Sequence, residues 1–403
     1  MDIINILRDK ILNIVSELVE DKNFKQPINI NNIVVERPKR QNQGDFSTNA
    51  AMVLGKALSY NPRDLGEIII VKLIDAELIN NVSLDGPGFL NITINPKFWD
   101  RLIVEIVTNT YKYGQISFGS GKKVNLEFVS ANPTGPLHLG HVRGAVFGDV
   151  LSRLLEFVGF KVTREYYVND GGVQIGILVR TIYFRYLEKL GECIELPEES
   201  YPGDYLIPIA EKLIEKYGNK LKNLEEFERD KIIRGLSIDY MMEIIKADLK
   251  SLNIEMDNYF SEQSMINSNG IEESLSTLKD KGLIYKGIID APKGKTYTDW
   301  QAREQLLFKS TEFDDDIDRP IKKSDGSWTY FAPDLAYHAD KLKRGFDVVI
   351  DVLGADHSGY VSRLKAVIKA FTEKKVEFEV KLVQLVKLIK NKSVLKMSKR
   401  AGD

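Results

Sequence analysis

Two histidines three residues apart, His138 and His141, stand where a strand-like run gives way to a helix-like run. The N-terminus of a helix presents unpaired backbone N–H groups and the positive end of the helix dipole, which suits a phosphate. Both imidazoles could donate hydrogen bonds to that phosphate as charge builds on its oxygens in a transition state. Gly140 removes a side chain where a flat base would approach the backbone. Taken alone, the motif fits a catalytic phosphate site, a histidine pair on a helix surface or an incomplete metal site.

A second group of reactive residue types lies near the end of the chain, in Lys396-Met-Ser-Lys399. Two lysines around a small hydroxyl residue can reach a triphosphate as point charges and draw off pyrophosphate as it leaves. By itself this tetrapeptide is typical of a solvated basic loop. Its interpretation therefore depends on the elements around it.

The elements that must position these residues alternate between strands and helices from Val124 onward. Such an order predicts an α/β fold with a doubly wound, Rossmann-like parallel sheet, which binds ligands at the carboxyl ends of its strands. A mostly charged helical segment without an obvious strand, at about 192–285, is predicted to be a helical insertion. The expected strands are 124–130, 161–168, 347–354 and 380–389, and the expected helices are 138–158, 172–191, 328–342 and 359–371.

The first 115 residues are predicted to form a separate small α+β domain. Its first helix is amphipathic, with Ile4, Leu7, Ile11, Val15 and Leu18 at helical spacing, unlike the unbroken apolar run of a signal peptide. The loop at 113–123 then separates this N-terminal domain (1–115) from the catalytic domain (122–403).

Composition narrows the class of protein. Among 403 residues, 28% are charged and the formal net charge is −2, so the protein is not basic overall. The single cysteine, Cys193, cannot form an internal disulfide, and no apolar run reaches about eighteen residues. We expect a cytoplasmic protein without a membrane span, and no protein-bound metal site.

The order of the two motifs is informative: His138-Leu-Gly-His141 follows the first strand of the sheet, and Lys396-Met-Ser-Lys399 follows the last. In this order and on this fold, the pair resembles the signature of class I aminoacyl-tRNA synthetases. The resemblance implies ATP and Mg²⁺, attack of an amino-acid carboxylate on the α-phosphate, and transfer to the 2′-hydroxyl of the terminal adenosine of a tRNA. It makes His138, His141, Lys396 and Lys399 catalytic, and Gly140 and Met397 part of the ATP site.

Several longer runs resemble arginyl-tRNA synthetases in particular: 127–141, 166–170, 318–326, 328–338 and 354–360. The resemblance implies tRNA(Arg), L-arginine and ATP as partners, with Glu127 and Asp334 holding the guanidinium and Tyr330 packing near it. It also implies that Ser130 and Asn132 bind the amino-acid end. A guanidinium is planar and permanently charged, so a buried site for it needs carboxylates in bidentate reach. Without the resemblance, Asp334 would be interpreted as an acid stabilised by a helix dipole, and Glu127 as an exposed strand residue.

The resemblance also assigns residues outside the arginine pocket. It places Gly354, Asp356 and His357 beside the adenosine of ATP, and gives His338 no role. The runs 43–49 and 85–91 are similar to the additional N-terminal domain of the family, which contacts the elbow of the tRNA. Gly44, Asp45 and Asn49 are accordingly expected to bind tRNA. Gly44, Asp45 and the Gly86-Pro-Gly88 turn fit equally well a role in shaping backbone turns alone.

The sequence departs from the family after the lysine motif, where members normally continue into an all-helical anticodon-binding domain. We expect this domain to be absent and the chain to be truncated, a monomer that binds ATP and arginine but charges tRNA poorly. Two alternatives stay open: a small nucleotidylyltransferase, which can also carry HxGH, and a non-catalytic tRNA-binding relative. Intact His138, His141, Lys396 and Lys399 argue against the second.

Overall fold

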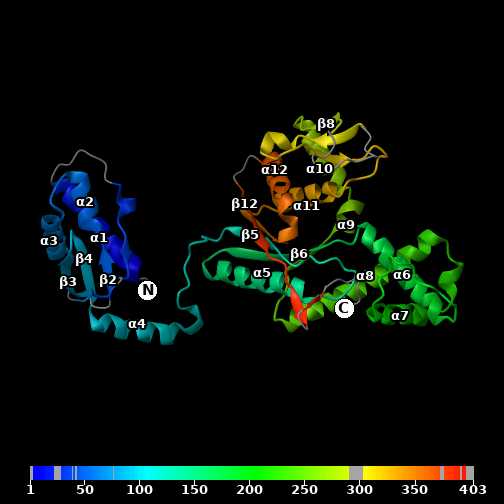
Figure 1. The fold of residues 1–403 in the computed structure, drawn as a ribbon, viewed down its shortest axis with the longest axis horizontal. Helices are drawn as coiled ribbons and strands as arrows, with labels where there is room; N and C mark the ends of the chain where they lie inside the picture. The colour runs from blue at the N-terminus through cyan, green and yellow to red at the C-terminus, as the bar shows by residue number, and fades with distance from the viewer. Residues whose placement is uncertain are drawn as a thin grey trace. The chain divides into compact units, whose positions relative to one another are not determined.

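The computed structural model describes residues 3–21, 29–38, 40, 43–75, 77–289, 303–372, 376–390 and 393–395. The chain divides into two compact units, residues 1–115 and 116–403, and each has hydrophobic cores of its own (Figure 1).

The first unit packs helices against a four-stranded antiparallel sheet with strand order β1-β2-β4-β3. Its strands are β1 (Val35–Glu36), β2 (Phe46–Thr48), β3 (Ile79–Asp85) and β4 (Phe89–Ile94), and its helices are α1 (Ile3–Asp21), α2 (Ala50–Leu58), α3 (Pro62–Leu73) and α4 (Pro96–Asn109). The predicted apolar face of α1 is buried at Leu7, Ile11, Val15 and Leu18, whereas Ile4 is exposed. The α+β prediction for this part of the chain is confirmed.

The second unit is built on a parallel five-stranded sheet with order β12-β11-β5-β6-β7. The strands are β5 (Lys123–Glu127), β6 (Lys161–Val168), β7 (Asn258–Ser261), β11 (Val348–Gly354) and β12 (Glu377–Val383). The flanking helices include α5 (Leu139–Phe157), α6 (Val173–Lys189), α11 (Phe331–Lys343) and α12 (Val361–Phe371). The doubly wound, Rossmann-like prediction is therefore confirmed.

Side-chain alternation along the central strand β5 gives the sheet two unlike faces. Val124 and Leu126 face an apolar core shared with α5 and α8 (Glu226–Ser251). The opposite face carries Glu127, which bonds to Lys341 of α11. In Figure 1, α5 and α11 lie on opposite sides of the sheet. One face is thus a conventional apolar core, and the other is polar and lies under α11.

The segment at 192–285 differs from its prediction, because it contributes the edge strand β7, which pairs in parallel with β6. β7 has only four half-buried residues, too short for a clear alternating pattern in the sequence. The helices of this segment are α7 (Ile207–Tyr217), α8, α9 (Glu262–Asn267) and α10 (Gly270–Asp280). α7 and part of α8 share a core with α6, while Met242 and Ile245 of α8 pack under the main sheet.

Two further sheets were not predicted. β8 (Ile284–Gly287), β9 (Gln305–Phe308) and β10 (Arg319–Lys322) form an antiparallel sheet, and β13 (Leu388–Lys390) pairs with β14 (Ser393–Leu395). The strand expected at 380–389 is β12 followed by the start of this hairpin.

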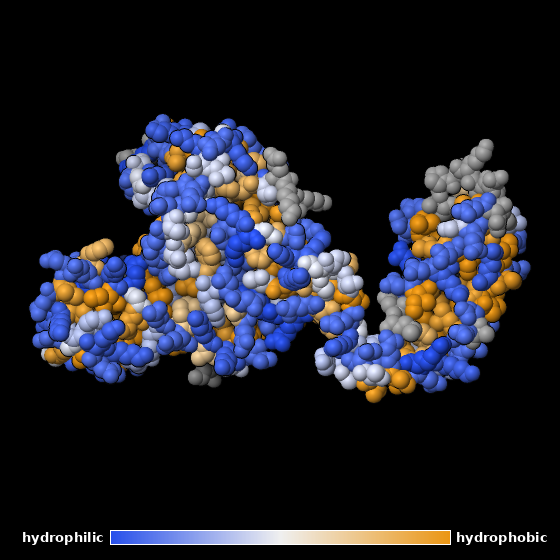
Figure 2. All heavy atoms as spheres, turned by 180° about the vertical axis from the view of Figure 1, so that it is seen from behind, coloured by the Kyte–Doolittle hydropathy of each residue, from blue (hydrophilic) through white to orange (hydrophobic). Residues whose placement is uncertain are grey.

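The surface in Figure 2 is largely hydrophilic, with hydrophobic residues in scattered patches. Within the described ranges, no helix combines the length and the apolar character that crossing a bilayer requires.

Candidate active site

The two histidines of the first motif cap α5. His138 is the N-cap residue, and its Nδ1 accepts a hydrogen bond from the backbone N–H of Gly140 at 3.1 Å. The Nδ1 of His141 accepts from the backbone N–H of His138 at 3.2 Å, and the two rings stack with centroids 3.7 Å apart. Because each Nδ1 is an acceptor, the proton of each neutral ring lies on Nε2. Both rings are therefore set to donate from Nε2 at a helix N-terminus.

Gly140 is needed for this cap. A Cβ at residue 140 would come within 3.0 Å of the His138 ring. Gly140 thus leaves room for the capping imidazole, and its expected place beside the base of ATP stays a prediction.

The backbone between β5 and this cap is strained. Val129 and Ser130 have φ values of 71° and 40°, in the left-handed region that a β-branched residue rarely adopts. The bend lets Ser130 donate from Oγ to Glu127 at 2.8 Å and accept from the backbone N–H of Tyr167 at 3.0 Å. Strain of this kind gathers at functional sites, so the β5–α5 connection is a candidate by geometry as well as by sequence.

Three carboxylates lie in register across neighbouring strands on the polar face of the sheet. Asp351 of β11 is opposite Glu127 of β5, which is opposite Glu165 of β6. Adjacent strands are about 4.8 Å apart, so these groups would repel one another without cations between them. All three are buried, and we call them the carboxylate row.

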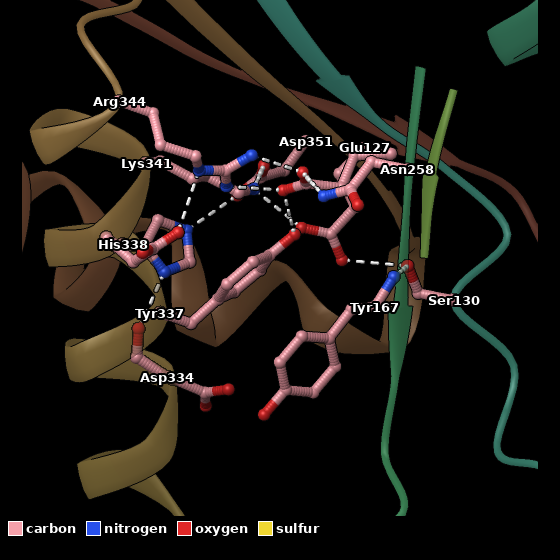
Figure 3. A network of polar contacts seen from close by, with 12 residues as sticks. Glu127, Ser130, Tyr167, Asn258, Asp334, Tyr337, His338, Lys341, Arg344 and Asp351 are labelled. Atoms are coloured by element: carbon pink, nitrogen blue, oxygen red, sulfur yellow. Dashed lines mark hydrogen bonds and ion pairs between the residues drawn. The ribbon is translucent and has the colours of Figure 1, made fainter. Parts of the chain in front are cut away.

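Lys341 of α11 places a positive charge between two members of this row, Glu127 and Asp351 (Figure 3). Its fully buried ammonium donates to Glu127 Oε2 at 2.6 Å and to Asp351 Oδ1 at 2.7 Å. Burial alone would lower the pKa of Lys341, but the charges of Asp351 and Glu127 outweigh burial and raise it. Burial likewise acts to raise the pKa of Asp351, yet Lys341 and His338 lower it overall.

The end of the row at Glu165 is neutralised by Arg344, which lies just past the C-terminal end of α11. The guanidinium binds Glu165 in bidentate fashion, at 2.5 and 2.8 Å, and Tyr337 and Asn258 also donate to this carboxylate. Burial would raise the pKa of Glu165, but the hydrogen bonds from Arg344 and the charge of Lys341 lower it to about 2. Glu165 is thus a fully bonded structural carboxylate.

Asp334 differs from the row. It lies in the first turn of α11, half-buried, and its carboxyl group receives no hydrogen bond from any described side chain. Burial raises the pKa of Asp334 to about 7, with the charge of His338 opposing the shift and the charge of Glu262 adding to it. A cation bound beside this carboxyl group would strongly stabilise its ionised form, because no side chain among the described residues does so already.

A further carboxylate near Asp334 was not anticipated. Glu262, at the start of α9, is buried and accepts from the hydroxyl of Tyr167 at 2.7 Å. Burial raises the pKa of Glu262, although the Tyr167 hydrogen bond acts against the shift. Tyr167 lies within a family-like run, but nothing in the sequence relates it to a residue 95 positions away.

The other residues expected to bind arginine or ATP differ in burial and in their hydrogen-bond partners. Asn132 donates to Gln174 of α6 at 2.9 Å. Tyr330 immediately precedes α11, and 73% of it is exposed. Asp356 and His357 are exposed on the short 3-10 helix Ala355–Tyr360 that follows Gly354, at the carboxyl end of β11.

The lysine motif lies outside the described residues. The expected roles of Lys396, Met397 and Lys399 therefore stay predictions.

In the first unit, Gly44, Asp45 and Asn49 all have internal partners. Gly44 has a φ of 78°, and a Cβ there would come within 2.7 Å of a backbone carbonyl of β4. Asp45 accepts from the backbone N–H of Ile94 at 2.7 Å, and Asn49 bonds to the backbone of residues 32 and 34. These contacts match the role in backbone shape that the sequence left open.

Comparison with known proteins agrees with this geometry. The family described as "tRNA synthetases class I (R), catalytic domain" matches residues 102–403, and "Arginyl tRNA synthetase N terminal domain" matches residues 4–94. The arginine–tRNA ligase of Roseobacter denitrificans is 50% identical over 98% of this chain, which covers 68% of that protein. The arginine–tRNA ligase of Ruegeria pomeroyi is 47% identical over 100% of this chain and 69% of its own length.

Solved structures give the same result. A crystal structure described as an arginyl-tRNA synthetase from Campylobacter jejuni is 35% identical with a TM-score of 0.63, over 74% of this chain and 62% of that one. Arginyl-tRNA synthetase from Plasmodium falciparum, at 18% identity, shares the fold with a TM-score of 0.62 over 95% of this chain and 65% of that one. With the HLGH cap, the parallel sheet and both family matches in agreement, the chain belongs to the arginine–tRNA ligase family of class I aminoacyl-tRNA synthetases.

Proposed function

We propose that the arginine guanidinium is bound at the start of α11, with Asp334 as its principal carboxylate. The observation that carries this proposal is that Asp334 has a half-buried carboxyl group with no donor among the described side chains and a pKa raised to about 7 by burial. A permanently charged guanidinium supplies the missing charge and two parallel N–H donors. Binding it would ionise Asp334 fully.

Glu127 is proposed to assist rather than to act as a second free carboxylate. Its Oε2 already accepts from Lys341 and its Oε1 from Ser130. A carboxylate has about four lone-pair sites, so roughly two are left for substrate. Ser130 and Asn132, on the connection that follows β5, are proposed to contact the amino-acid end.

ATP is proposed to lie with its phosphates at the N-terminus of α5. His138 and His141 would donate from Nε2 to the α-phosphate as the arginine carboxylate attacks it and pyrophosphate departs. Gly354, Asp356 and His357 are proposed to border the adenosine, at the carboxyl end of β11.

Mg²⁺ is proposed to be held mainly by the ATP phosphates. The described residues contain no group of three His, Cys, Asp or Glu side chains that could cage an ion. This suits Mg²⁺, which commonly keeps waters and substrate phosphates as ligands. When bound, the ion would neutralise phosphate charge.

We further propose that the protein transfers arginine to the 2′-hydroxyl of tRNA(Arg), that the first unit contacts the tRNA, and that the protein is a monomer. Because Gly44, Asp45 and Asn49 are bonded internally, we propose that they support a tRNA-binding surface by fixing the fold of the 43–49 loop.

The test is ATP–pyrophosphate exchange with arginine, with and without tRNA(Arg), for the chain and for Asp334→Asn. We expect exchange that depends on arginine and is lost in Asp334→Asn. Asp314→Asn is the matched control, because it removes a carboxylate that is exposed and paired with Lys369. Undiminished exchange in Asp334→Asn would refute the proposed pocket, and exchange with a phosphorylated metabolite instead of arginine would indicate a nucleotidylyltransferase.

A further inference from the structure

His338 is buried in the middle of α11, and both of its ring nitrogens lie within hydrogen-bond distance of an oxygen. Nδ1 is 2.7 Å from the backbone carbonyl oxygen of Asp334, and Nε2 is 2.9 Å from Oδ2 of Asp351. A carbonyl oxygen can only accept. Asp351 is ionised because Lys341 also donates to it, at 2.7 Å. Donation to both oxygens requires a proton on each ring nitrogen, which is the imidazolium form.

The charges of the surrounding network agree with this assignment. The carboxylate row carries three negative charges, and Lys341 and Arg344 supply only two positive ones. A charged His338 provides a third positive charge, one for each carboxylate of the row, while Arg344 also pairs at 2.7 Å with the partly exposed Asp340. A neutral ring would leave the row one positive charge short. It would also place two acceptors side by side, 2.7 Å apart at Nδ1 or 2.9 Å apart at Nε2 depending on the tautomer.

Asp334 lies one helical turn before His338, so the two share a face of α11 (Figure 3). We propose that His338 is a positively charged positioning residue of the arginine pocket, which fastens the first turns of α11 to β11 and keeps the carboxyl group of Asp334 ionised for a cationic substrate. The inference rests on the proposed role of Asp334 in binding arginine.

The titratable and aromatic groups around His338 and Asp334 come from several neighbouring elements. His338 contacts Asp351 of β11 and makes a T-shaped contact with the ring of Phe378 of β12, with Tyr337 beside it on α11. The carboxyl group of Asp334 feels the charges of His338, Glu262, Glu127 and Asp351. Among these four, His338 lowers the pKa of Asp334 and the three carboxylates raise it.

Two neutral variants separate the charge of the ring from its hydrogen bonds. In His338→Asn the amide can still donate to the carbonyl four residues earlier, as Asn109 does to Glu105 at 3.0 Å on α4. In His338→Gln the longer amide can still reach Asp351. Phe378→Leu is the packing control, because it loosens the contact with the ring and leaves every charge in place.

The first measurement is the ¹⁵N spectrum of the histidines in the whole chain at pH 7.5, with the His338 signal assigned by its loss in His338→Asn. We expect a pair of nitrogens that are both protonated. A signal from a ring with one bare nitrogen would overturn the inference, whatever the variants do.

The second measurement is arginine affinity by calorimetry between pH 6 and 8.5. For the unaltered chain and for Phe378→Leu, we expect affinity to fall as the pH drops through about 7. In both His338 variants the midpoint should move up by about one unit or more, with roughly tenfold weaker binding at pH 7 and recovery toward the control at pH 8.5. An unchanged midpoint in both variants would overturn the inference. Asp334→Asn distinguishes the two proposals: if it binds arginine as well as the unaltered chain, the proposed pocket is wrong, independently of His338.

Discussion

At the scale of single residues, the active site contrasts carboxylates that are neutralised internally with one that is not. Glu165 receives hydrogen bonds from three side chains, and Glu127 from two. Asp334 receives none from the described residues. A buried carboxyl group without a partner costs stability, which is tolerable where a substrate supplies the partner.

Asp334→Asn should therefore stabilise the chain while abolishing arginine binding. The folded pKa of Asp334, about 7, is above its unfolded value near 4, so its contribution to stability is present at low pH and is lost as the pH rises through 7. Because the group is half-buried, we expect a gain on the order of 2 kcal/mol at pH 8 that shrinks to about a third of this at pH 5 and vanishes below the unfolded pKa. Urea unfolding at the two pH values measures this, and equal stability at pH 8 would contradict it.

Lys341→Met should destabilise strongly, because it leaves Glu127 and Asp351 buried beside each other without their shared cation. We expect a loss of about 3–5 kcal/mol at pH 7. The pKa of Asp351 is lowered in the folded chain, so the stabilisation is present above the ordinary carboxyl range and fades as the pH falls through the lowered pKa. The loss should thus shrink toward acid pH in urea titrations. Lys381→Met, which removes a partly exposed lysine paired with Glu379, should cost almost nothing.

At the scale of elements, α5 and α11 approach the sheet in different ways. α5 brings its N-terminus to the carboxyl end of β5, where His138 caps the helix and is proposed to donate a hydrogen bond to the ATP phosphate. α11 instead lays a polar face along the carboxylate row. The first arrangement is local in the sequence, and the second joins residues more than 200 positions apart.

The two roles of His138 can be separated by substitution. His138→Asn should keep the cap, because Asn is among the best N-cap residues, but should lose at least about 100-fold in pyrophosphate exchange. His138→Ala should lose the same activity and also about 1 kcal/mol of stability. If His138→Asn retains near-normal exchange, the ring has no catalytic role.

At the scale of the whole molecule, each unit has its own hydrophobic core. Leu7 belongs to the core of the first unit, and Leu335 to a core of the second. Units with separate cores can unfold separately.

Leu7→Ala should lower hydrogen-exchange protection in residues 3–109 by about 2–5 kcal/mol and leave the peptides of β5, β6 and β11 unchanged. Leu335→Ala should do the reverse. Mass spectrometry of exchanged peptides reads both units at once, and a common loss of protection in either variant would show that the units unfold together.

The sequence by itself determined the parallel sheet, the family and the place of HLGH at the start of a helix, because these follow from local periodicity and from motifs taken in order. It missed β7 and the β8-β9-β10 sheet, whose strands are four residues long. Only the tertiary structure showed that Glu127 is paired with Lys341, that Glu262 lies near Asp334, and that His338 bridges two elements. The physical reason is that a buried charge depends on partners from distant strands and helices, and strand order and register bring those partners together only in the folded chain.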